Sequence, residues 1–383
     1  MERPLRIAVV IPKYGLTGGA EGFAAELTGR LARNPRYEFH VFANRWIANS
    51  DRITFHKVPI VTFPKFLTTV SFAWFVKKMT EKTPFDLIHT HERIFRADIF
   101  TMHGVPHRFW VRDVRRKRVM SLYDAATDWT ERKLVRSDAC RFFLPVSTLT
   151  EEVFLETYPI DRRKVRVIHP GIHLQQGGYD PERRRRARAE IGISQQEALI
   201  LFVSMNFEIK GLDHLLKALA VLRSRGPTEN FKLLVVGKGD ERKYRALSRT
   251  LRIDDLVLFT GQLTRERMEE IYLAADIYAM LSRFDTFGMV VLEAMAAGLP
   301  VVVSTNVGAR DLVIEGENGF VVEKVGDAEE VADKIALLLD ENIRRRMGEK
   351  ALETALSHTW EAVAADVEAI YAETLYEQMP RRT

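Results

Sequence analysis

Short apolar runs alternate along the chain with longer stretches in which apolar residues recur every three or four positions. The run 6–11 is β-branched and typical of a buried strand, whereas 20–33 carries Phe23 and Leu27 with the spacing of one helix face. Glycines separate these two segments, as at a strand-to-helix turn. The same pattern predicts strands at 6–11, 38–43, 86–90, 141–146, 199–204, 231–236, 256–259, 277–281 and 299–304, and helices at 20–33, 66–79, 211–223, 241–251, 265–274, 288–297 and 359–377.

Regular alternation of strand and helix predicts a mostly parallel, doubly wound sheet, and the chain repeats it twice. Between the repeats, 175–192 has the composition of a linker followed by a charged surface helix. We therefore predict an α/β protein of two Rossmann-like, doubly wound domains facing each other across a cleft. The first spans 1–172 and the second 173–358.

Composition excludes several classes of protein. The chain has 383 residues, enough for two domains with separate cores, and 46% are hydrophobic without any apolar run near 18 residues. We expect a soluble protein. We expect no secretory signal, because residues 1–4 lead directly into the first predicted strand, and the single Cys140 fits a reducing cytoplasm.

The net charge of +5 hides an asymmetry between the halves. Residues 1–172 contain 29 Lys and Arg against 18 Asp and Glu, whereas the remainder contains 28 against 34. A basic first half suggests an anionic partner: nucleic acid, a membrane surface or a phosphorylated substrate. A basic, solvated face without any partner is the alternative.

In open α/β sheets, ligands bind at the turns that follow the carboxyl ends of strands. Gly18 and Gly19 lie in such a turn and let the backbone approach a phosphate at the start of the next helix, although paired glycines also serve ordinary tight turns. Lys210 immediately precedes Gly211 and an amphipathic helix, where its ammonium can meet a diphosphate. An ordinary solvated lysine is the alternative there.

The stretch 235–244 contains G-x-G after a strand but lacks the third glycine of a dinucleotide fingerprint. We interpret its Asp240 as the cap of the following helix.

Two acids flank a helix start in 282–304. Asp285 lies on the loop, Gly288 opens the helix, and Glu293 lies about a turn and a half further along, on a helix with no other charge. The first amides of this helix can hold an anion, and a carboxylate in a buried helix needs a hydroxyl partner. This layout suits a nucleotide sugar, although Glu293 on a solvated stripe is the alternative.

The motifs resemble those of retaining GT-B glycosyltransferases of the family 4 type, and among these the bacterial lipopolysaccharide-core glucosyltransferases. The similarity covers almost the whole chain and is more specific in the second half. It rests on D-x-F-G-x-x-x-x-E followed by EAMAAGLPVVVS, on GARDLVIEGENGFVV, on KGLDHLLKAL and on HTWEAVAADVEAIY.

The resemblance implies roles for the residues that match. The first acid, Asp285, contacts hydroxyls of the donor sugar, the last acid, Glu293, binds the ribose, and Lys210 binds the diphosphate. The N-terminal glycine loop is Gly18 and Gly19. Backbone groups that help to hold sugar and diphosphate are Thr286, Phe287, Gly288 and Met289. The final helix, within 359–383, is implied to cross back to the first domain.

Three positions depart from the family pattern. Asp285 is one methylene shorter than the usual Glu, which puts donor choice in doubt. Met205 stands where most relatives have an arginine, and Arg310-Asp311 replaces a common Pro-Glu pair.

The implied reaction moves a hexose from a nucleoside-diphosphate sugar, UDP-glucose or a related UDP sugar, to a hydroxyl of a glycan or lipid-linked acceptor, with retention of configuration. Synthesis of lipopolysaccharide or another cell-surface glycan is the implied setting. We expect no cofactor and no metal, because the sequence contains no D-x-D and because Lys210 and helix amides can stabilise the leaving diphosphate.

Three histidines lie at strand ends. Relatives often have a histidine lining the donor site where this chain has His103, and a structural histidine is the alternative. His89 and His91 alternate along a strand end, where metal binding lacks further ligands.

The acceptor side is the basic first half. The stretch 107–118 combines six basic residues with Phe109 and Trp110, which we expect to be exposed, and this suits an anionic membrane or a phosphorylated glycolipid. The apolar helix 66–79 is either buried or interfacial, and we expect it to be buried. We expect no nucleic acid to bind, because no recognised module accompanies the charge. A nucleotide-sugar epimerase and a non-catalytic nucleotide-sugar-binding protein are the alternatives to a transferase.

Overall fold

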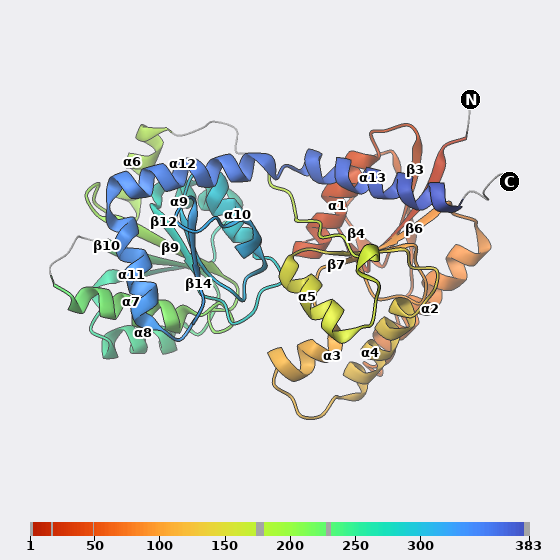
Figure 1. The fold of residues 1–383 in the computed structure, drawn as a ribbon, viewed down its shortest axis with the longest axis horizontal. Helices are drawn as coiled ribbons and strands as arrows, with labels where there is room; N and C mark the ends of the chain where they lie inside the picture. The colour runs from red at the N-terminus through yellow and green to blue at the C-terminus, as the bar shows by residue number, and fades with distance from the viewer. Residues whose placement is uncertain (1–2, 17, 49, 174–179, 227–230, 379–383) are drawn as a thin grey trace. The chain divides into compact units, whose positions relative to one another are not determined.

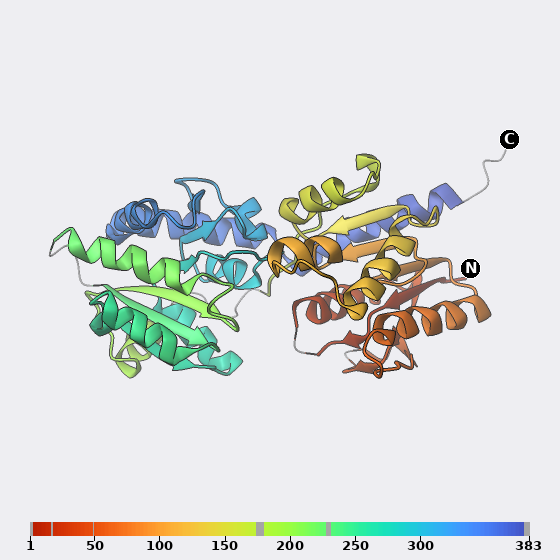
Figure 2. The same ribbon diagram turned by 90° about the horizontal axis from the view of Figure 1, so that it is seen from below.

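The computed structural model describes residues 3–16, 18–48, 50–173, 180–226 and 231–378 (Figure 1). The chain forms two compact units. Unit 1 comprises Met1–Gly171 and Trp360–Thr383, and unit 2 comprises Ile172–Thr359. Figure 2 shows helices on both faces of the sheet in each unit, the arrangement of a doubly wound α/β fold.

Unit 1 is built on a six-stranded parallel sheet in the order β5-β3-β1-β6-β7-β8. Side chains of β1 alternate between two cores: Ile7 and Val9 pack on one face, Ala8 and Val10 on the other. Helices α1 and α13 cover the first face, and α2 and α4 the second. The strands are β1 (Leu5–Val10), β3 (Tyr37–Ala43), β5 (Ile53–Lys57), β6 (Leu87–Thr90), β7 (Ile99–Met102) and β8 (Phe142–Pro145), with a separate pair β2 (Lys13–Tyr14) and β4 (Arg45–Trp46).

The helices of unit 1 are amphipathic in the expected way. Phe23 and Leu27 of α1 pack beside Trp360 and Val367 of α13, the last helix of the chain. The bounds are α1 (Gly19–Leu31), α2 (Leu67–Lys82), α3 (His107–Phe109), the π-helical turn η1 (Trp110–Val114), α4 (Leu122–Val135), α5 (Thr148–Thr157), the 3₁₀ turn η2 (Arg162–Lys164) and α13 (Trp360–Gln378).

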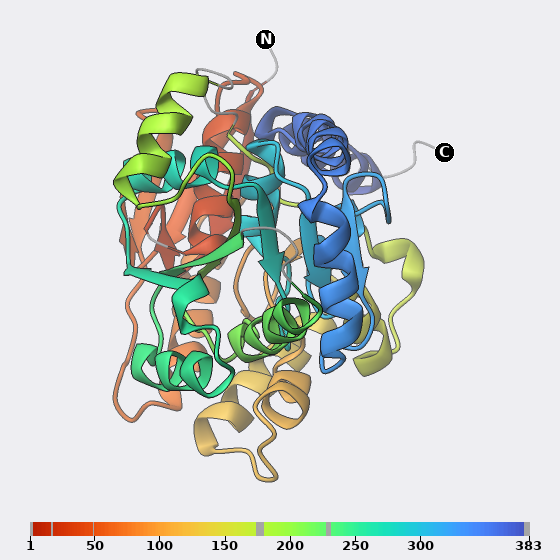
Figure 3. The ribbon, with the colours of Figure 1, turned by 90° about the vertical axis from the view of Figure 1, so that its left-hand side faces the viewer.

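Unit 2 repeats this plan with the parallel order β11-β10-β9-β12-β13-β14. Its strands are almost wholly apolar because helices cover both faces of the sheet. In Figure 3, α11 (blue) packs beside α7 (green). The bounds are α6 (Pro181–Glu190), β9 (Ala198–Ser204), α7 (Leu212–Ser224), β10 (Phe231–Gly237), α8 (Glu241–Thr250), η3 (Asp254–Leu256), β11 (Val257–Gly261), α9 (Arg265–Ala274), β12 (Ile277–Met280), α10 (Met289–Ala296), β13 (Val301–Ser304), η4 (Gly308–Leu312), β14 (Gly319–Val322), α11 (Ala328–Leu339) and α12 (Glu341–Ser357).

The predicted fold class of two doubly wound parallel units is confirmed, and one local expectation is wrong. The helix predicted at 66–79 is not buried: Trp74 of α2 is 43% exposed, because only one face of this helix meets the sheet. The charged surface helix expected within 175–192 is α6; within it Arg188 is fully buried, and its guanidinium lies 2.9 Å from Asp276 Oδ2. The linker expected at the start of that segment, 175–179, lies outside the described residues.

Candidate functional site

The turn between β9 and α7 carries Lys210. Gly211 follows it at φ 75°, as the residue that begins α7, and a Cβ there would overlap the carbonyl oxygen of Leu281. Only glycine combines this left-handed conformation with so close a backbone approach. The contact with Leu281 fixes the Lys210 turn against the end of β12, the strand that pairs with β9.

The turn between β12 and α10 carries Asp285 and the helix start. Gly288 adopts φ 92°, and a Cβ at this position would lie 2.9 Å from Met280 Cε and 3.2 Å from Asp285 Oδ2. The backbone amide of Arg283 donates to the carbonyl of Ile209 at 2.8 Å, which joins this turn to the preceding one. Two turns from separate parts of the sequence therefore form one rim at the carboxyl ends of β9 and β12.

Lys210 and Asp285 meet at this rim. The ammonium of Lys210 forms an ion pair with Asp285 Oδ2, while the backbone amide of Phe287 donates to Asp285 Oδ1 at 3.4 Å. Both side chains retain some exposure, 22% for Lys210 and 15% for Asp285. The Asp285 carboxylate is thus the anion at the start of α10, in contact with two of the donors that we predicted for a diphosphate.

Glu293 lies on α10, the helix that begins at this rim. Its Oε2 accepts a hydrogen bond of 2.8 Å from the hydroxyl of Tyr272 on α9, and the side chain is partly buried. Burial raises the pKa of Glu293, and the hydrogen bond from Tyr272 partly offsets that rise. Glu293 is therefore held by a buried partner and does not lie on a fully solvated stripe.

Tyr272 is a residue that the sequence did not single out. It is 4% exposed, and burial together with the nearby Glu293 charge raises its pKa well above the ordinary value, so the phenol stays protonated and donates. In the sequence, the position of Tyr272 within α9 indicated only a residue on the apolar face of a helix.

The glycine turn of unit 1 leads into α1. Gly18 and Gly19 are both exposed, and a Cβ on Gly18 would overlap the carboxylate of Glu21. Glu21 lies in the first turn of α1, where a negative charge is favourable next to the helix amides. A resident carboxylate therefore lies at this helix start, as Asp285 does at α10. Residue 17 of this turn lies outside the described residues.

His89, His91 and His103 form a stack at the carboxyl ends of β6 and β7. His103 Nε2 lies 3.0 Å from His91 Nδ1, and the rings of His91 and His89 are 4.4 Å apart. Burial lowers the pKa of His89 and of His103 to about 3 and that of His91 well below its ordinary value, so all three are neutral near pH 7.

His89 has a structural role, since its two ring nitrogens contact the hydroxyls of Thr101 and Tyr371 at 2.7 Å each. Among the described residues, no group of three or more His, Cys, Asp or Glu is arranged to hold a metal ion.

The basic stretch 107–118 differs from the expectation. Phe109 and Trp110 are partly buried where we expected exposure, and α3 packs against α4. Arg108 and Arg115 are held by carboxylates of α4, at 3.3 Å from Asp128 and 3.2 Å from Asp124. The exposed basic residues of the stretch are Arg112, Arg115, Arg116, Lys117 and Arg118, and Arg108 is partly buried.

Helix α4 carries an acidic inner face that sequence reasoning missed. Asp124, Asp128 and Glu131 recur at helical spacing and are at most 3% exposed. Glu131 accepts hydrogen bonds from Arg93 at 2.6 Å and Tyr158 at 2.8 Å. Burial opposes ionisation of Asp124, but hydrogen bonds from Ser121 and His107 and the charge of Arg115 lower its pKa to about 2. The spacing of these acids was the available signal, hidden by the expectation that charged residues face solvent.

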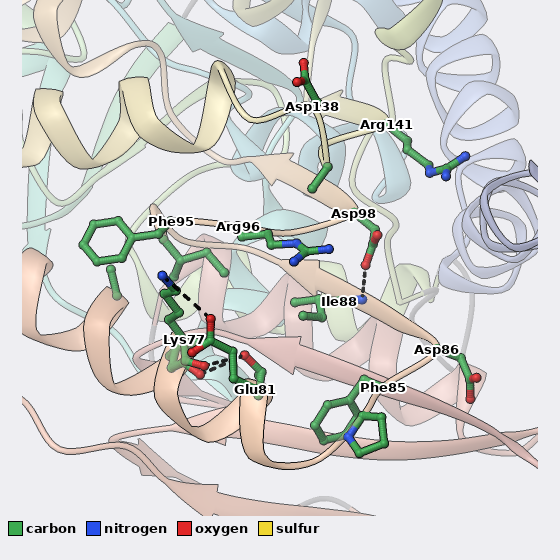
Figure 4. A pocket seen from close by; sticks show the side chains of 16 residues that line it. Lys77, Glu81, Phe85, Asp86, Ile88, Phe95, Arg96, Asp98, Asp138 and Arg141 are labelled. Carbon is green, nitrogen blue, oxygen red and sulfur yellow. Dashed lines mark hydrogen bonds and ion pairs between the residues drawn. The ribbon is translucent and has the colours of Figure 1, made fainter. Parts of the chain in front are cut away.

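A hollow of about 430 Å³ lies elsewhere in unit 1, between α2 and the amino ends of β6 and β7 (Figure 4). Lys77 and Glu81 form a 3.7 Å ion pair at its rim, and Asp98 accepts a 2.8 Å hydrogen bond from the amide of Ile88. None of the predicted site residues lines it, because they lie at the carboxyl ends of the strands.

Comparisons with known proteins fit this geometry. A family model described as Glycosyl transferases group 1 matches residues 183–354, and one described as Glycosyltransferase Family 4 matches residues 17–176. A D-inositol 3-phosphate glycosyltransferase of Corynebacterium glutamicum is 32% identical over 243 residues, which are 61% of this chain and 57% of that protein. The chain spans about half the length of this protein and of two similar D-inositol 3-phosphate glycosyltransferases from other corynebacteria. An uncharacterized glycosyltransferase of Methanocaldococcus jannaschii is 28% identical over 82% of this chain and 84% of its own length.

Solved structures share the fold at low sequence identity. WaaG, a glycosyltransferase involved in lipopolysaccharide biosynthesis, superposes with a TM-score of 0.77 at 21% identity over 95% of this chain and 99% of WaaG. Sucrose-phosphate synthase from Thermosynechococcus elongatus gives 0.76 at 22% identity over 98% and 100%. Anabaena HepE in complex with UDP and glucose gives 0.70 at 18% identity over 96% and 99%.

Proposed function

Because the chain belongs to the glycosyltransferases of group 1 and family 4 and has their GT-B fold, we propose that it transfers a hexose from a nucleoside-diphosphate sugar to an acceptor hydroxyl. One observation carries this proposal. Lys210, Asp285 and the start of α10 meet at one rim of unit 2, and Glu293 lies behind them on the same helix. An ammonium, helix amides and two acids are the groups that a sugar, a diphosphate and a ribose need.

We assign each part of the donor to a group. Lys210 and the backbone from Thr286 to Met289 bind the diphosphate, Asp285 binds hexose hydroxyls, and Glu293 binds the ribose. UDP-glucose or a related UDP sugar is the proposed donor, which the similarity to a HepE complex with UDP and glucose supports. On binding, the diphosphate takes the Lys210 ammonium from Asp285, and this carboxylate turns to the sugar.

The proposed chemistry retains anomeric configuration and needs no metal. Breaking the bond between the sugar and the diphosphate places negative charge on the leaving group, and Lys210 together with the amides at Gly288 stabilises that charge. In unit 1, the helix start at Gly18 and Gly19 and the neutral imidazole of His103 are the groups that we assign to the donor site. Phe23 of α1 packs against His103 at 4.9 Å between ring centroids, so these groups share one region of unit 1.

The proposed acceptor is a glycan or glycolipid, with a phosphorylated one favoured. The basic surplus of residues 1–172 supports an anionic acceptor. Two comparisons point the same way, since the curated relatives are named for D-inositol 3-phosphate and WaaG for lipopolysaccharide biosynthesis. We propose a role in cell-surface glycan synthesis on this basis.

We also propose a cytoplasmic enzyme that contacts the anionic inner membrane surface through α2 and α4. No helix in the described part of the chain is long and apolar enough to cross a membrane. Trp74 and Trp129 are 43% and 41% exposed, and Lys78 and Lys133 lie 4.0 and 4.3 Å from their ring centroids. Exposed tryptophan beside lysine suits the boundary between lipid headgroups and water.

The function is tested by incubating the protein with UDP-, GDP- and ADP-hexoses and following nucleotide release. Release that requires an acceptor, with a product of the same anomeric configuration, is the expected result. An epimerase would convert the donor without an acceptor, and a binding protein would shift the melting temperature without turnover. Unchanged rates after chelation of divalent cations are expected, and loss of activity that Mg²⁺ restores would contradict the metal-free assignment.

A further inference from the structure

The geometry points to Tyr272 as a positioning residue that fixes the Glu293 carboxylate for the vicinal hydroxyls of a ribose. This inference rests on the proposed function, because it assumes a nucleoside diphosphate at the rim of unit 2. It adds a residue from another helix, α9, to the site. The 2.8 Å hydrogen bond from the Tyr272 hydroxyl to Glu293 Oε2 is the observation behind it.

Glu293 has one oxygen restrained and one available. Tyr272 engages Oε2, and among the described residues no other side chain or backbone group donates to this carboxylate. The side chain keeps partial exposure, so a ligand hydroxyl can reach the remaining acceptor positions. A glutamate has several rotatable bonds, and holding it in one orientation before the ligand arrives removes an ordering cost from binding.

Tyr272 is itself rigid, which a positioning role requires. It is 4% exposed, and it belongs to the same buried region as Ile271 and Ala274. Its hydroxyl cannot act as an acid near neutral pH, since burial and the Glu293 charge raise its pKa well above the ordinary value. The phenol is therefore a permanent donor, and its hydrogen bond favours the ionised form of Glu293 against the burial that raises the pKa of this carboxyl.

The test is Tyr272→Phe, which removes one oxygen atom and keeps the ring. UDP, ADP and GDP are titrated by calorimetry, and the nucleotide that binds wild type most tightly is compared with its 2′-deoxy form. We expect Tyr272→Phe to weaken the ribonucleotide about tenfold and the 2′-deoxynucleotide much less, because the lost restraint acts through the hydroxyl that Glu293 binds. Equal weakening of both nucleotides, or no weakening of either, would overturn the inference.

Binding against pH gives a second readout. Removing the tyrosine hydrogen bond raises the pKa of Glu293 further, so the acid limb of ribonucleotide binding should move to higher pH in Tyr272→Phe. An unmoved acid limb would count against the positioning role.

Tyr244 provides a matched control in the same unit. It is 1% exposed, and its hydroxyl has no hydrogen-bonding partner among the described residues, so Tyr244→Phe should leave nucleotide binding unchanged.

Glu293→Ala distinguishes failure of the proposed donor site from failure of the role of Tyr272. If that variant binds nucleotides as wild type does, the proposed donor site itself fails; if it loses binding while Tyr272→Phe does not, only the role of Tyr272 fails.

Discussion

Lys210 and Asp285, 75 residues apart in sequence, form an ion pair at the carboxyl edge of the sheet in unit 2. The backbone amide of Phe287 donates to the same carboxylate. Asp285 therefore engages two of the groups that we assign to the donor diphosphate. In the proposed mechanism, the lysine exchanges between this carboxylate and the diphosphate during binding and product release.

Asp285→Asn should bind free nucleoside diphosphate several-fold more tightly than wild type and transfer sugar more slowly. The variant removes the competing charge from Lys210 while it also weakens contacts with the hexose. Calorimetry with UDP and initial rates with the active donor measure the two effects. Asp255→Asn, which breaks the surface pair with Arg223, should change neither; weaker UDP binding by Asp285→Asn would contradict the competition.

Lys210→Ala should lower the rate of transfer about 100-fold or more, because the charge that develops on the leaving diphosphate loses its cation. Lys217→Ala is the matched control, since Lys217 is an exposed lysine on α7, the helix that follows Lys210. Initial rates at saturating acceptor, with circular dichroism spectra of both variants, provide the measurement. A folded Lys210→Ala enzyme with wild-type rates would remove this residue from the site.

Gly211→Ala should reduce the free energy of unfolding by at least about 2 kcal/mol. The left-handed φ of 75° disfavours alanine, and the added Cβ would overlap the carbonyl oxygen of Leu281. Gly326→Ala in the same unit should stay within about 0.5 kcal/mol, because no atom lies within 4 Å of the added Cβ and its φ is not positive. Urea unfolding followed by far-ultraviolet circular dichroism measures both, and equal stabilities would show that the turn tolerates a side chain.

Acidification should destabilise unit 1. His89 has an ordinary pKa of 6.5 that burial lowers to about 3 in the folded protein, so below pH 6.5 the unfolded chain binds a proton that the folded chain does not. The stability that this neutral histidine contributes is complete above pH 6.5 and is lost toward pH 3, at about 1.4 kcal/mol for each pH unit and each such histidine. His91 and His103 act in the same direction.

Tryptophan fluorescence reports the unfolding of unit 1, because all five tryptophans of the chain belong to this unit. Urea unfolding between pH 5 and pH 7 should show stability that rises with pH, and His89→Gln should flatten the slope by about one proton. A slope that is unchanged in His89→Gln would show that this histidine does not titrate on unfolding.

Replacing Trp74 and Trp129 by serine together should weaken binding to vesicles that contain phosphatidylglycerol by about tenfold or more, because two interfacial anchors are lost. Sedimentation with anionic and with phosphatidylcholine vesicles, at low and high salt, measures binding and its charge dependence. Tyr376→Ser, at a 78% exposed position on α13, is the control. Equal binding of wild type to both kinds of vesicle would contradict an anionic membrane surface as the partner.

Much of this protein follows from local sequence pattern. The alternation of apolar runs and helical spacing determined two doubly wound units, because strand and helix periodicities depend on residues only a few positions apart. Asp240 as a helix cap was predicted from its place after Gly239 and is confirmed, since its side chain accepts from the amide of Lys243. Lys210 and Asp285 are predicted as site residues from their places at strand-to-helix turns, and Glu293 from its place inside a helix with no other charge. The specific role of each residue is implied by the family resemblance.

What only the tertiary structure decided is which of these groups touch. Strand β12 pairs with β9, although α7 to α9 separate them in sequence, and this pairing brings Lys210 to Asp285. The tertiary structure likewise brings the hydroxyl of Tyr272 on α9 to Glu293 on α10, and it pairs the guanidinium groups of Arg108 and Arg115 with carboxylates of α4. Such contacts depend on the order of the strands in the sheet and on the rotation of each helix about its axis. Neither can be read from a residue and its neighbours in sequence.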